Sequence, residues 1–267
     1  MRNAQVAWIS RIIAIALIWS AGCVDNAAKK RLDQGANALN EHRYDEAGAA
    51  ANDYLAKYPN GPEAARALYI QGQAYELRAA ESKEQTAAAR SDLESAKTAY
   101  TRGLTLRAPA DVSAHLHSGL ANVAYFEEDY GTALREWQTA YANFKNDDSG
   151  PWILYRIGLC QQRLGWFPQA DHTFNDVRQQ YPGSEAAGRA ATRIGAKAFY
   201  VQVGAFNDNA NAQKLAQSLA QQGLSAGVAV DAGGRYAVRV GPAATYADAK
   251  MLRNRVAGQY PGAVILP

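Results

Sequence analysis

The chain has 267 residues, of which 48% are hydrophobic and 20% are charged, and its formal net charge is +3. This is an ordinary composition for a soluble protein with room for about two domains, and so small a positive charge does not call for a nucleic acid partner. The two cysteines are too few for a disulfide framework, which excludes the small disulfide-stabilised folds.

The first 22 residues have the pattern of a targeting segment. Arg2 and Arg11 supply basic charge, an apolar run at 12–19 is too short to span a bilayer, and small residues at 20–22 lead to Cys23. We therefore expect residues 1–22 to be a signal peptide that takes no part in the fold.

This run resembles a bacterial lipoprotein signal with its cleavage box. The resemblance implies that Cys23 becomes the first residue and carries lipid on its thiol and its amine. Val24 follows where an aspartate would signal retention at the inner membrane. We therefore expect a lipid anchor on the periplasmic face of the outer membrane, with residues 23–30 as a short tether. The alternatives are a plain secretory signal cut near Ala21 and an uncleaved anchor.

The middle of the chain, residues 31–197, shows a helical pattern that repeats. Three alanines recur at steps of 37 residues, and an aromatic residue follows each of them four residues later. The pairs are Ala96 with Tyr100, Ala133 with Trp137, and Ala170 with Phe174. A small residue where two helices touch, with a bulky one a turn further on, is typical of tetratricopeptide-like packing. We predict an all-α solenoid that binds protein partners.

The individual repeats can be bounded from the same pattern. They are expected at 30–58, 63–107, 111–144 and 150–181, with a capping helix at 185–197. An insertion around 80–90, rich in Ala, Glu and Lys, predicts an extended and solvated helical hairpin. No Pro-, Ser- or Gly-rich linker follows, so we expect the last domain to be closely coupled to the repeats. This part also resembles tetratricopeptide lipoproteins of the outer membrane that serve envelope assembly.

Two runs in the last part of the chain, residues 198–267, alternate between apolar and polar side chains as half-buried strands do. In the run 199–206, one face would carry Phe199, Val201 and Val203, and the other Tyr200, Gln202 and Gly204. In the run 236–242, one face would carry Tyr236, Val238 and Val240, and the other Ala237 and Arg239.

Helical patterns at 212–222 and 246–256 and weak strands at 226–230 and 263–266 complete a βαββαβ order. This predicts a small α+β domain with a split βαβ, RNP-like sheet, in which the first and third strands are central neighbours. Helices would cover one face and leave the other open. Gln202 and Arg239 would then meet in the middle of the open face.

These two strand motifs resemble the SPOR domain, the sporulation-related repeat family of bacterial cell-wall-binding modules. The resemblance implies binding to peptidoglycan glycan strands that have lost their stem peptides, commonly at division sites, through Tyr200, Gln202, Gly204 and Arg239. Tyr200 offers a ring for sugar stacking, and Gln202 offers a donor and an acceptor for hydroxyl and acetamido groups. Arg239 can pair with a free lactyl carboxylate. Ala237 departs from the family, since many members have a basic or polar residue there.

No constellation of catalytic, metal-ligating or cofactor-binding residues is evident, so we expect no metal, no cofactor and no enzymatic activity. His115 and His117 are two residues apart, which points them in different directions on a helix. Asp111 with His115 has the spacing of a ligand pair but lacks a third ligand. Cys160 lies at a small, buried repeat position and is predicted to be an inert core thiol.

Of the tryptophans in the repeats, Trp137 and Trp152 are expected in the core, whereas Trp166 follows Gly165 at a turn and is the best candidate for an exposed partner contact. RNA binding is disfavoured because the chain has an export signal and lacks aromatic pairs on both central strands.

The function expected from these features is that of a peptidoglycan-binding adaptor lipoprotein, anchored in the outer membrane and enriched at the division site. Its helical repeats would recruit protein partners. The alternative is a scaffold for envelope assembly or secretion that acts mainly through the repeats.

Overall fold

The computed structural model describes residues 26–82 and 86–267. The signal peptide predicted at 1–22 and the lipidation predicted at Cys23 lie outside these residues. The chain divides into two compact units, one reaching to Gly119 and one from Leu120 to Pro267, and the boundary falls inside a helix. Each unit is described by itself.

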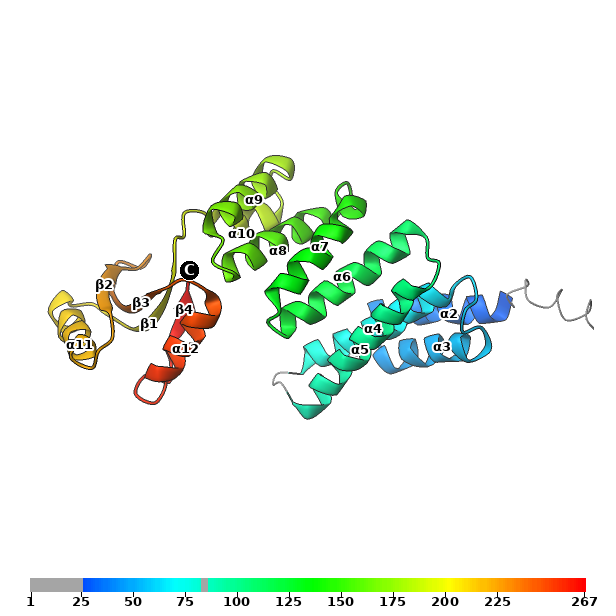
Figure 1. Ribbon diagram of the computed structural model, residues 1–267, viewed down its shortest axis with the longest axis horizontal. Coiled ribbons are helices and arrows are strands. Elements are labelled where there is room, and N and C mark those ends of the chain that lie inside the picture. Colours follow the sequence, from blue (N-terminus) through cyan, green and yellow to red (C-terminus); the bar gives the residue numbers. More distant parts are fainter. Residues whose placement is uncertain (1–25, 83–85) are drawn as a thin grey trace, which may run out of the picture. The chain divides into compact units, whose positions relative to one another are not determined.

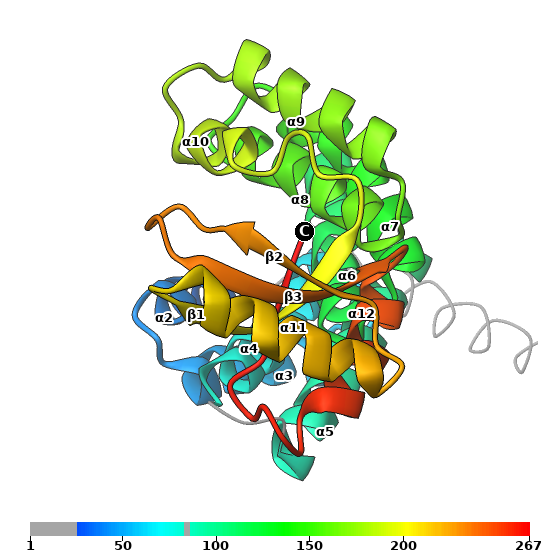
Figure 2. The same ribbon diagram turned by 90° about the vertical axis from the view of Figure 1, so that its left-hand side faces the viewer.

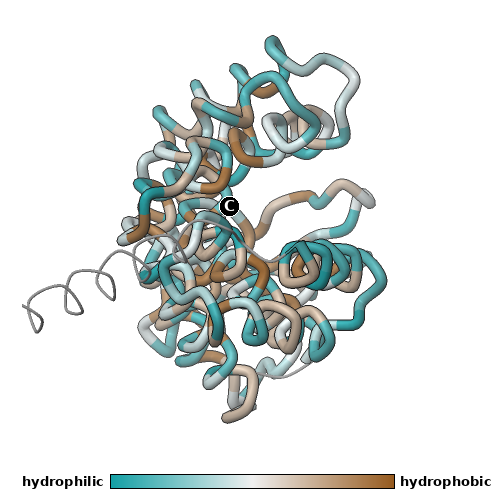
Figure 3. Tube along the Cα trace, turned by 90° about the vertical axis from the view of Figure 1, so that its right-hand side faces the viewer, coloured by the Kyte–Doolittle hydropathy of each residue, from teal (hydrophilic) through white to brown (hydrophobic). Residues whose placement is uncertain are grey.

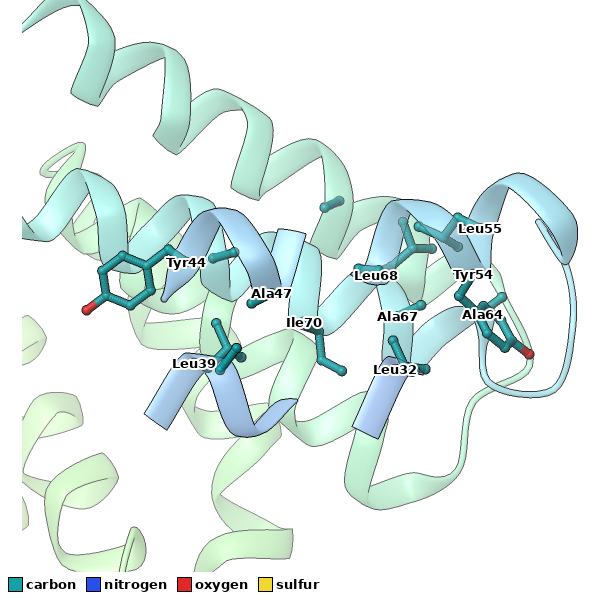
Figure 4. Packing of buried hydrophobic residues seen from close by; sticks show 14 residues of the cluster. Leu32, Leu39, Tyr44, Ala47, Tyr54, Leu55, Ala64, Ala67, Leu68 and Ile70 are labelled. Carbon is teal, nitrogen blue, oxygen red and sulfur yellow. The ribbon is translucent and has the colours of Figure 1, made fainter. Parts of the chain in front are cut away.

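The first unit consists of helices that pack on their neighbours along the chain (Figure 1). They are α2 (Asn26–Asn40), α3 (Tyr44–Lys57), α4 (Ala64–Glu81), α5 (Ala87–Thr105) and the first part of α6 (Ala110–Phe126). The apolar sides of α2 to α5 form one core, shown in part in Figure 4, in which Leu32, Leu68 and Ile70 are 2% exposed or less. Hydrophilic and hydrophobic residues alternate along the helices in Figure 3, as expected where each helix buries one side.

Small residues let the helices approach one another, as the 37-residue pattern predicts. A Cβ atom on Gly72 would lie 2.4 Å from the ring of Tyr100, and one on Gly119 would lie equally close to that ring. Tyr100 is therefore held between α4 and α6, and it donates a hydrogen bond of 2.7 Å to the buried carboxylate of Glu76. In the second unit Gly158 gives Phe174 the same kind of space, with a Cβ distance of 2.6 Å.

The insertion around 80–90 lengthens two neighbouring helices. Helix α4 has 18 residues and α5 has 19, and they pack against each other as the predicted hairpin of long helices. Helix α5 begins after Thr86, whose side chain accepts a hydrogen bond from the N–H of Ala89 and so caps the helix.

The second unit begins with the rest of α6 and continues with α7 (Tyr130–Phe144), α8 (Gly150–Arg163), α9 (Phe167–Gln180) and α10 (Glu185–Ala191). Helix α10 is shorter than the helix predicted at 185–197. The N–H groups of Thr192 and Arg193 turn back to the carbonyls three residues earlier, at 3.3 and 2.9 Å. This is the bonding of a 3₁₀ turn, with which many α-helices end.

A small α+β domain completes the second unit. Its elements are β1 (Phe199–Phe206), α11 (Asn209–Gln221), β2 (Ala226–Val230), β3 (Tyr236–Ala243), α12 (Tyr246–Val256) and β4 (Val264–Leu266). All the strand pairs are antiparallel, and the strand order β2-β3-β1-β4 places β1 and β3 at the centre, as predicted.

Both helices of this domain cover the same face of the sheet (Figure 2). Leu219 of α11 and Val256 of α12 share one core with Val201, Val238 and Val240 of the central strands. The fold is therefore a tetratricopeptide-like α-helical solenoid followed by the predicted βαββαβ domain. Within the described ranges 26–82 and 86–267, no helix is both long and apolar enough to cross a membrane.

Candidate functional site

The face of the sheet opposite α11 and α12, called the open face below, carries one polar row across the strands. Gln202 of β1 stands opposite Arg239 of β3, as the sequence predicts. The same row continues to Gly227 on β2 and to Val264 on β4. Directly opposed residues in antiparallel strands point to the same side. The side chains of Gln202 and Arg239 therefore lie next to each other on the open face.

Two further rows complete the open face. Tyr200 stands opposite Leu266 of β4, and Ala205 stands opposite Ala237, which in turn pairs with Ala229 of β2. The open face thus has an aromatic and aliphatic end at Tyr200, a polar middle, and an end of small residues. The sequence alone does not place Val264 and Leu266 on this face, because the short last strand gives too weak a pattern to fix its register.

Gly204 does not belong to the open face, and the prediction that places it beside Tyr200 and Gln202 is wrong. The register between β1 and β3 shifts after Gln202, so that Gly204 stands opposite Val238 of the core. A Cβ atom on Gly204 would meet the side chains of Phe206 at 3.4 Å and Leu215 of α11 at 3.9 Å. The irregularity reverses the alternation of the strand beyond Gln202.

Arg239 is the one charged side chain of this polar row, and it is held without a partner. Its Nε atom is buried and makes no hydrogen bond within the described part of the chain, and no ion pair is found there for its guanidinium. Burying an unpaired donor is costly, because the hydrogen bonds to water are lost and nothing replaces them. An acceptor brought by a ligand would remove that cost.

Ala237 offers little to a ligand. Its side chain is 0% exposed. The position at which the sequence departs from the SPOR pattern is therefore closed to solvent.

Tyr200 is placed by a glycine on the neighbouring strand. Gly241 has a φ angle of +143°, and a Cβ atom there would lie 3.0 Å from Cδ1 of Tyr200. A side chain at 241 would thus displace the ring. This role was missed from the sequence, although the Gly241-Pro242 pair at the end of the strand is a signal of special backbone geometry.

Within the second unit, the α+β domain sits on the helices through an aromatic cluster. The ring of Phe167, at the start of α9, lies 5.5 Å from that of Phe199, which lies 5.8 Å from Tyr246. The guanidinium carbon of Arg163 lies 3.4 Å from the centre of the Tyr246 ring, the distance of a cation–π contact. These contacts confirm the close coupling expected from the missing linker.

Two contacts at neighbouring helix turns extend this junction. Nζ of Lys250, on α12, donates hydrogen bonds of 2.7 and 2.5 Å to the two carboxylate oxygens of Glu128. Gly165, between α8 and α9, approaches the loop after β3 so closely that a Cβ atom would lie 2.6 Å from the carbonyl oxygen of Ala244. Among residues 26–82 and 86–267, these contacts between the helices and the α+β domain thus involve α12, its preceding loop and the start of β1, and none of them involves Gln202 or Arg239.

The other residues singled out from the sequence are placed as follows. Cys160 is 0% exposed, and burial raises the pKa of its thiol to about 12, which confirms the buried core position. His115 bonds the backbone oxygen of Asp111 at 2.8 Å. In residues 26–82 and 86–267, no group of three or more His, Cys, Asp and Glu side chains could hold a metal ion. Trp137 is buried, and Trp166 is 48% exposed, as predicted.

A second surface feature lies on the first unit. A hollow of about 370 Å³ opens between α4 and α5, and polar and aromatic side chains line it. Its lining comprises Leu68, Gln71, Tyr75, Ser91, Glu94, Ser95, Thr98, Ala99 and Arg102.

Residues 195–267 match the family model of the SPOR domain, which covers the whole βαββαβ domain. Comparison with curated proteins gives no significant match. Among solved structures, the chain is similar to MamA protein, with 16% identity and a TM-score of 0.45 over 62% of this chain and 81% of that one. It is also similar to a thermophilic TPR protein of Thermus thermophilus, with 16% identity and a TM-score of 0.38 over 62% of this chain and 98% of that one. At these TM-scores, neither likeness adds to what the helices show directly.

The match to the SPOR model indicates a peptidoglycan-binding module and hence a protein of the cell envelope. Tetratricopeptide-like repeats are protein-interaction folds. Both parts of the chain are therefore of kinds that bind rather than catalyse.

Proposed function

We propose that this chain is a non-enzymatic adaptor that holds peptidoglycan glycan strands lacking stem peptides on its open face and recruits protein partners through its helical repeats. The observation that carries this proposal is the row of Gln202 and Arg239 on an uncovered sheet face, with the buried Nε of Arg239 left without an acceptor.

The chemistry of the stripped strand fits this row. Removal of the stem peptide from muramic acid leaves a free lactyl carboxylate, whereas an intact stem peptide occupies that carboxyl group in an amide bond. Arg239 can donate two parallel hydrogen bonds to a carboxylate, and such charge-assisted bonds are about twice as strong as neutral ones. A neutral amide would replace neither the charge nor the second acceptor oxygen. Selectivity for stripped strands follows from this difference.

The neighbouring residues fit the rest of a sugar unit. Gln202 offers a donor and an acceptor for hydroxyl and acetamido groups. Tyr200 and Leu266 form an apolar end of the face, on which the C–H side of a sugar ring can rest. Each neutral hydrogen bond contributes about 0.5–1.5 kcal/mol net, so a few contacts give weak binding to one site. Clustering of many copies on a membrane would raise the avidity.

The proposed membrane anchor depends on the first part of the chain. Lipidation of Cys23 would anchor the protein in the outer membrane, with residues 1–22 removed as signal peptide. The segment 23–30 would then be the tether, followed by the repeat domain at 31–197 and the SPOR domain at 198–267. Enrichment at the division site would follow if stripped glycan gathers there.

The hollow between α4 and α5 is the place we assign to a protein partner. The side chains of Gln71, Glu94 and Arg102 offer such a partner hydrogen-bond donors and acceptors beside the ring of Tyr75.

Sedimentation with cell-wall sacculi tests the proposal. The full-length chain without its signal peptide should pellet with amidase-treated sacculi and much less with untreated ones, and Arg239→Ala and Gln202→Ala should each weaken the pelleting. Equal pelleting of the wild type and both variants would remove these residues from the site. A parallel turnover assay on the same sacculi should release no soluble glycan.

The alternative function is that of a scaffold for envelope assembly or secretion, in which the repeats carry the activity. Localisation separates the two functions. Loss of septal enrichment in the Arg239→Ala variant favours the wall-binding adaptor, whereas unchanged localisation of that variant favours the scaffold.

A further inference from the structure

The strands of the α+β domain contain three glycines, and neither packing nor backbone geometry accounts for one of them, Gly227 on β2. Gly204 faces side chains of the core, and Gly241 has a φ angle of +143° and lies against the ring of Tyr200. The φ angle of Gly227 lies outside the left-handed range, and a Cβ atom there would meet nothing within 4 Å. A glycine inside a strand costs stability relative to alanine, and it often marks a place where another molecule approaches the backbone closely.

Gly227 lies directly beside Arg239 on the open face. The register pairs Arg239 with Gly227 on one side and with Gln202 on the other. The side chain of Arg239 does not lie over Gly227, because its atoms would then come within 4 Å of the Cβ position. Since β2 is an edge strand, the bare surface over Gly227 continues from Arg239 to the edge of the sheet.

The other positions next to Arg239 on the open face are occupied. Along β3, Ala237 is closed to solvent and Gly241 lies against the ring of Tyr200. On β1, the side chain of Gln202 stands in the same row. The side of Gly227 is therefore the one from which a bulky group can reach the guanidinium.

We propose that Gly227 is a specificity-determining residue of the glycan site, and that the pyranose ring of muramic acid lies against its bare backbone while the lactyl carboxylate pairs with Arg239. This inference rests on the proposed function and names the part of the sheet that receives the sugar ring. The carboxylate would supply the acceptor that the buried Nε of Arg239 lacks within the described residues.

The length of the lactyl group fits this arrangement. A single carbon atom separates its carboxyl group from the ether oxygen on the sugar, so the ring must lie close to the guanidinium that binds the carboxylate. Neighbouring strands are about 4.8 Å apart, which places the backbone of Gly227 within that reach of the β3 strand. Any side chain at 227 would then compete with the sugar ring for the same space.

The test compares binding of amidase-stripped glycan strands to the full chain without its signal peptide. Gly227→Ala should weaken binding about fivefold and Gly227→Val about fiftyfold, because extra carbon atoms are forced into a close contact. Val230→Ile is the matched control, since it adds one carbon atom to the same strand at a residue that is 65% exposed and three positions along, hence on the other face. Its binding should equal that of the wild type.

Urea unfolding gives a second readout that a merely structural role would move the other way. Gly227→Ala should raise the urea midpoint or leave it unchanged, because alanine restricts the unfolded chain and nothing in the folded chain opposes the new methyl group. Weaker binding without a lower midpoint is the result that the inference predicts. A lower midpoint would overturn it, since the place over Gly227 would not be empty.

The outcomes also separate this inference from the proposed function. If both Gly227 variants bind like the wild type while Arg239→Ala loses binding, the role of Gly227 is refuted and the proposed function stands. If the wild type does not bind stripped strands at all, the proposed function itself fails.

Discussion

The guanidinium carbon of Arg163 lies 3.4 Å from the centre of the Tyr246 ring, and this contact joins the last helical hairpin to the first turn of α12. The same arginine lies 5.9 Å from the ring of Tyr130. One cation thus lies near an aromatic ring from the repeats and one from the α+β domain, so these two parts of the second unit should respond together to a change at Arg163.

Replacing Arg163 by alanine should loosen this junction. Cation–π contacts contribute about 0.5–2 kcal/mol, depending on how far they are removed from water. We expect faster proteolytic cleavage of Arg163→Ala in the segment 192–198 between α10 and β1, and a lower free energy of unfolding. Arg135→Ala is the control, because Arg135 is an exposed arginine of α7 whose side chain, in the part of the chain that the structure describes, donates a hydrogen bond to Thr132 alone. Equal cleavage of both variants would show that the Arg163 contact does not hold the domain.

Gly165 and Gly183 form a matched pair for the tightness of the same junction. Their φ angles are +82° and +81°, but a Cβ atom on Gly165 would lie 2.6 Å from the Ala244 oxygen, whereas one on Gly183 meets nothing within 4 Å. In both alanine variants, the left-handed backbone conformation lowers the free energy of unfolding by about 1–2 kcal/mol. Only Gly165→Ala also forces the loop after β3 away. Urea unfolding should therefore show a larger loss of stability for Gly165→Ala, and equal losses would contradict the close contact.

Gly204→Ala tests the corrected geometry of β1. The new methyl group would meet Phe206 and Leu215 at 3.4 and 3.9 Å, which is ordinary van der Waals contact on the helix side. We expect binding of stripped glycan to remain at the wild-type level, whereas Gln202→Ala should lower it. A loss of binding in Gly204→Ala without a loss of stability would place Gly204 back on the open face.

The strands β1 and β3 show which features of the site can be predicted from the sequence and which cannot. The alternation of apolar residues placed Gln202 opposite Arg239, because both lie in regular stretches of β1 and β3. The alternation predicts the wrong face for Gly204. A period of two holds only where no extra residue is inserted into a strand, and the sequence does not mark the irregularity after Gln202. The contacts of Arg163 with Tyr246 and of Glu128 with Lys250 join residues far apart in the chain, which no local pattern encodes.

The repeats were predictable for the opposite reason. The spacing of Ala96, Ala133 and Ala170 reflects a contact that every hairpin makes, and all three are 0% exposed. The end of α10 was not predictable to within a turn, since alanine and arginine residues favour a helix beyond the point at which the chain turns toward β1.

Cys160 should resist thiol reagents in the folded chain. Burial raises the pKa of its thiol to about 12, so the reactive thiolate is almost absent at neutral pH. In a Cys23→Ser chain, labelling of Cys160 should require unfolding and should follow the urea transition. Because the thiol releases its proton more readily when unfolded, stability should fall as the pH rises above about 9, the ordinary thiol value. Rapid labelling at neutral pH without urea would contradict the burial of α8.

The central claim is that Arg239 recognises the carboxylate exposed when a stem peptide is removed, and a thermodynamic cycle measures this directly. Stripped glycan strands are compared before and after their lactyl carboxylates are converted to amides, each with the wild type and with Arg239→Ala, and the four dissociation constants are determined. Amidation should weaken binding to the wild type about tenfold, the loss of one charge-assisted hydrogen-bonded pair, and should have no further effect on Arg239→Ala. Equal effects of amidation on both proteins, or none on either, would contradict the account.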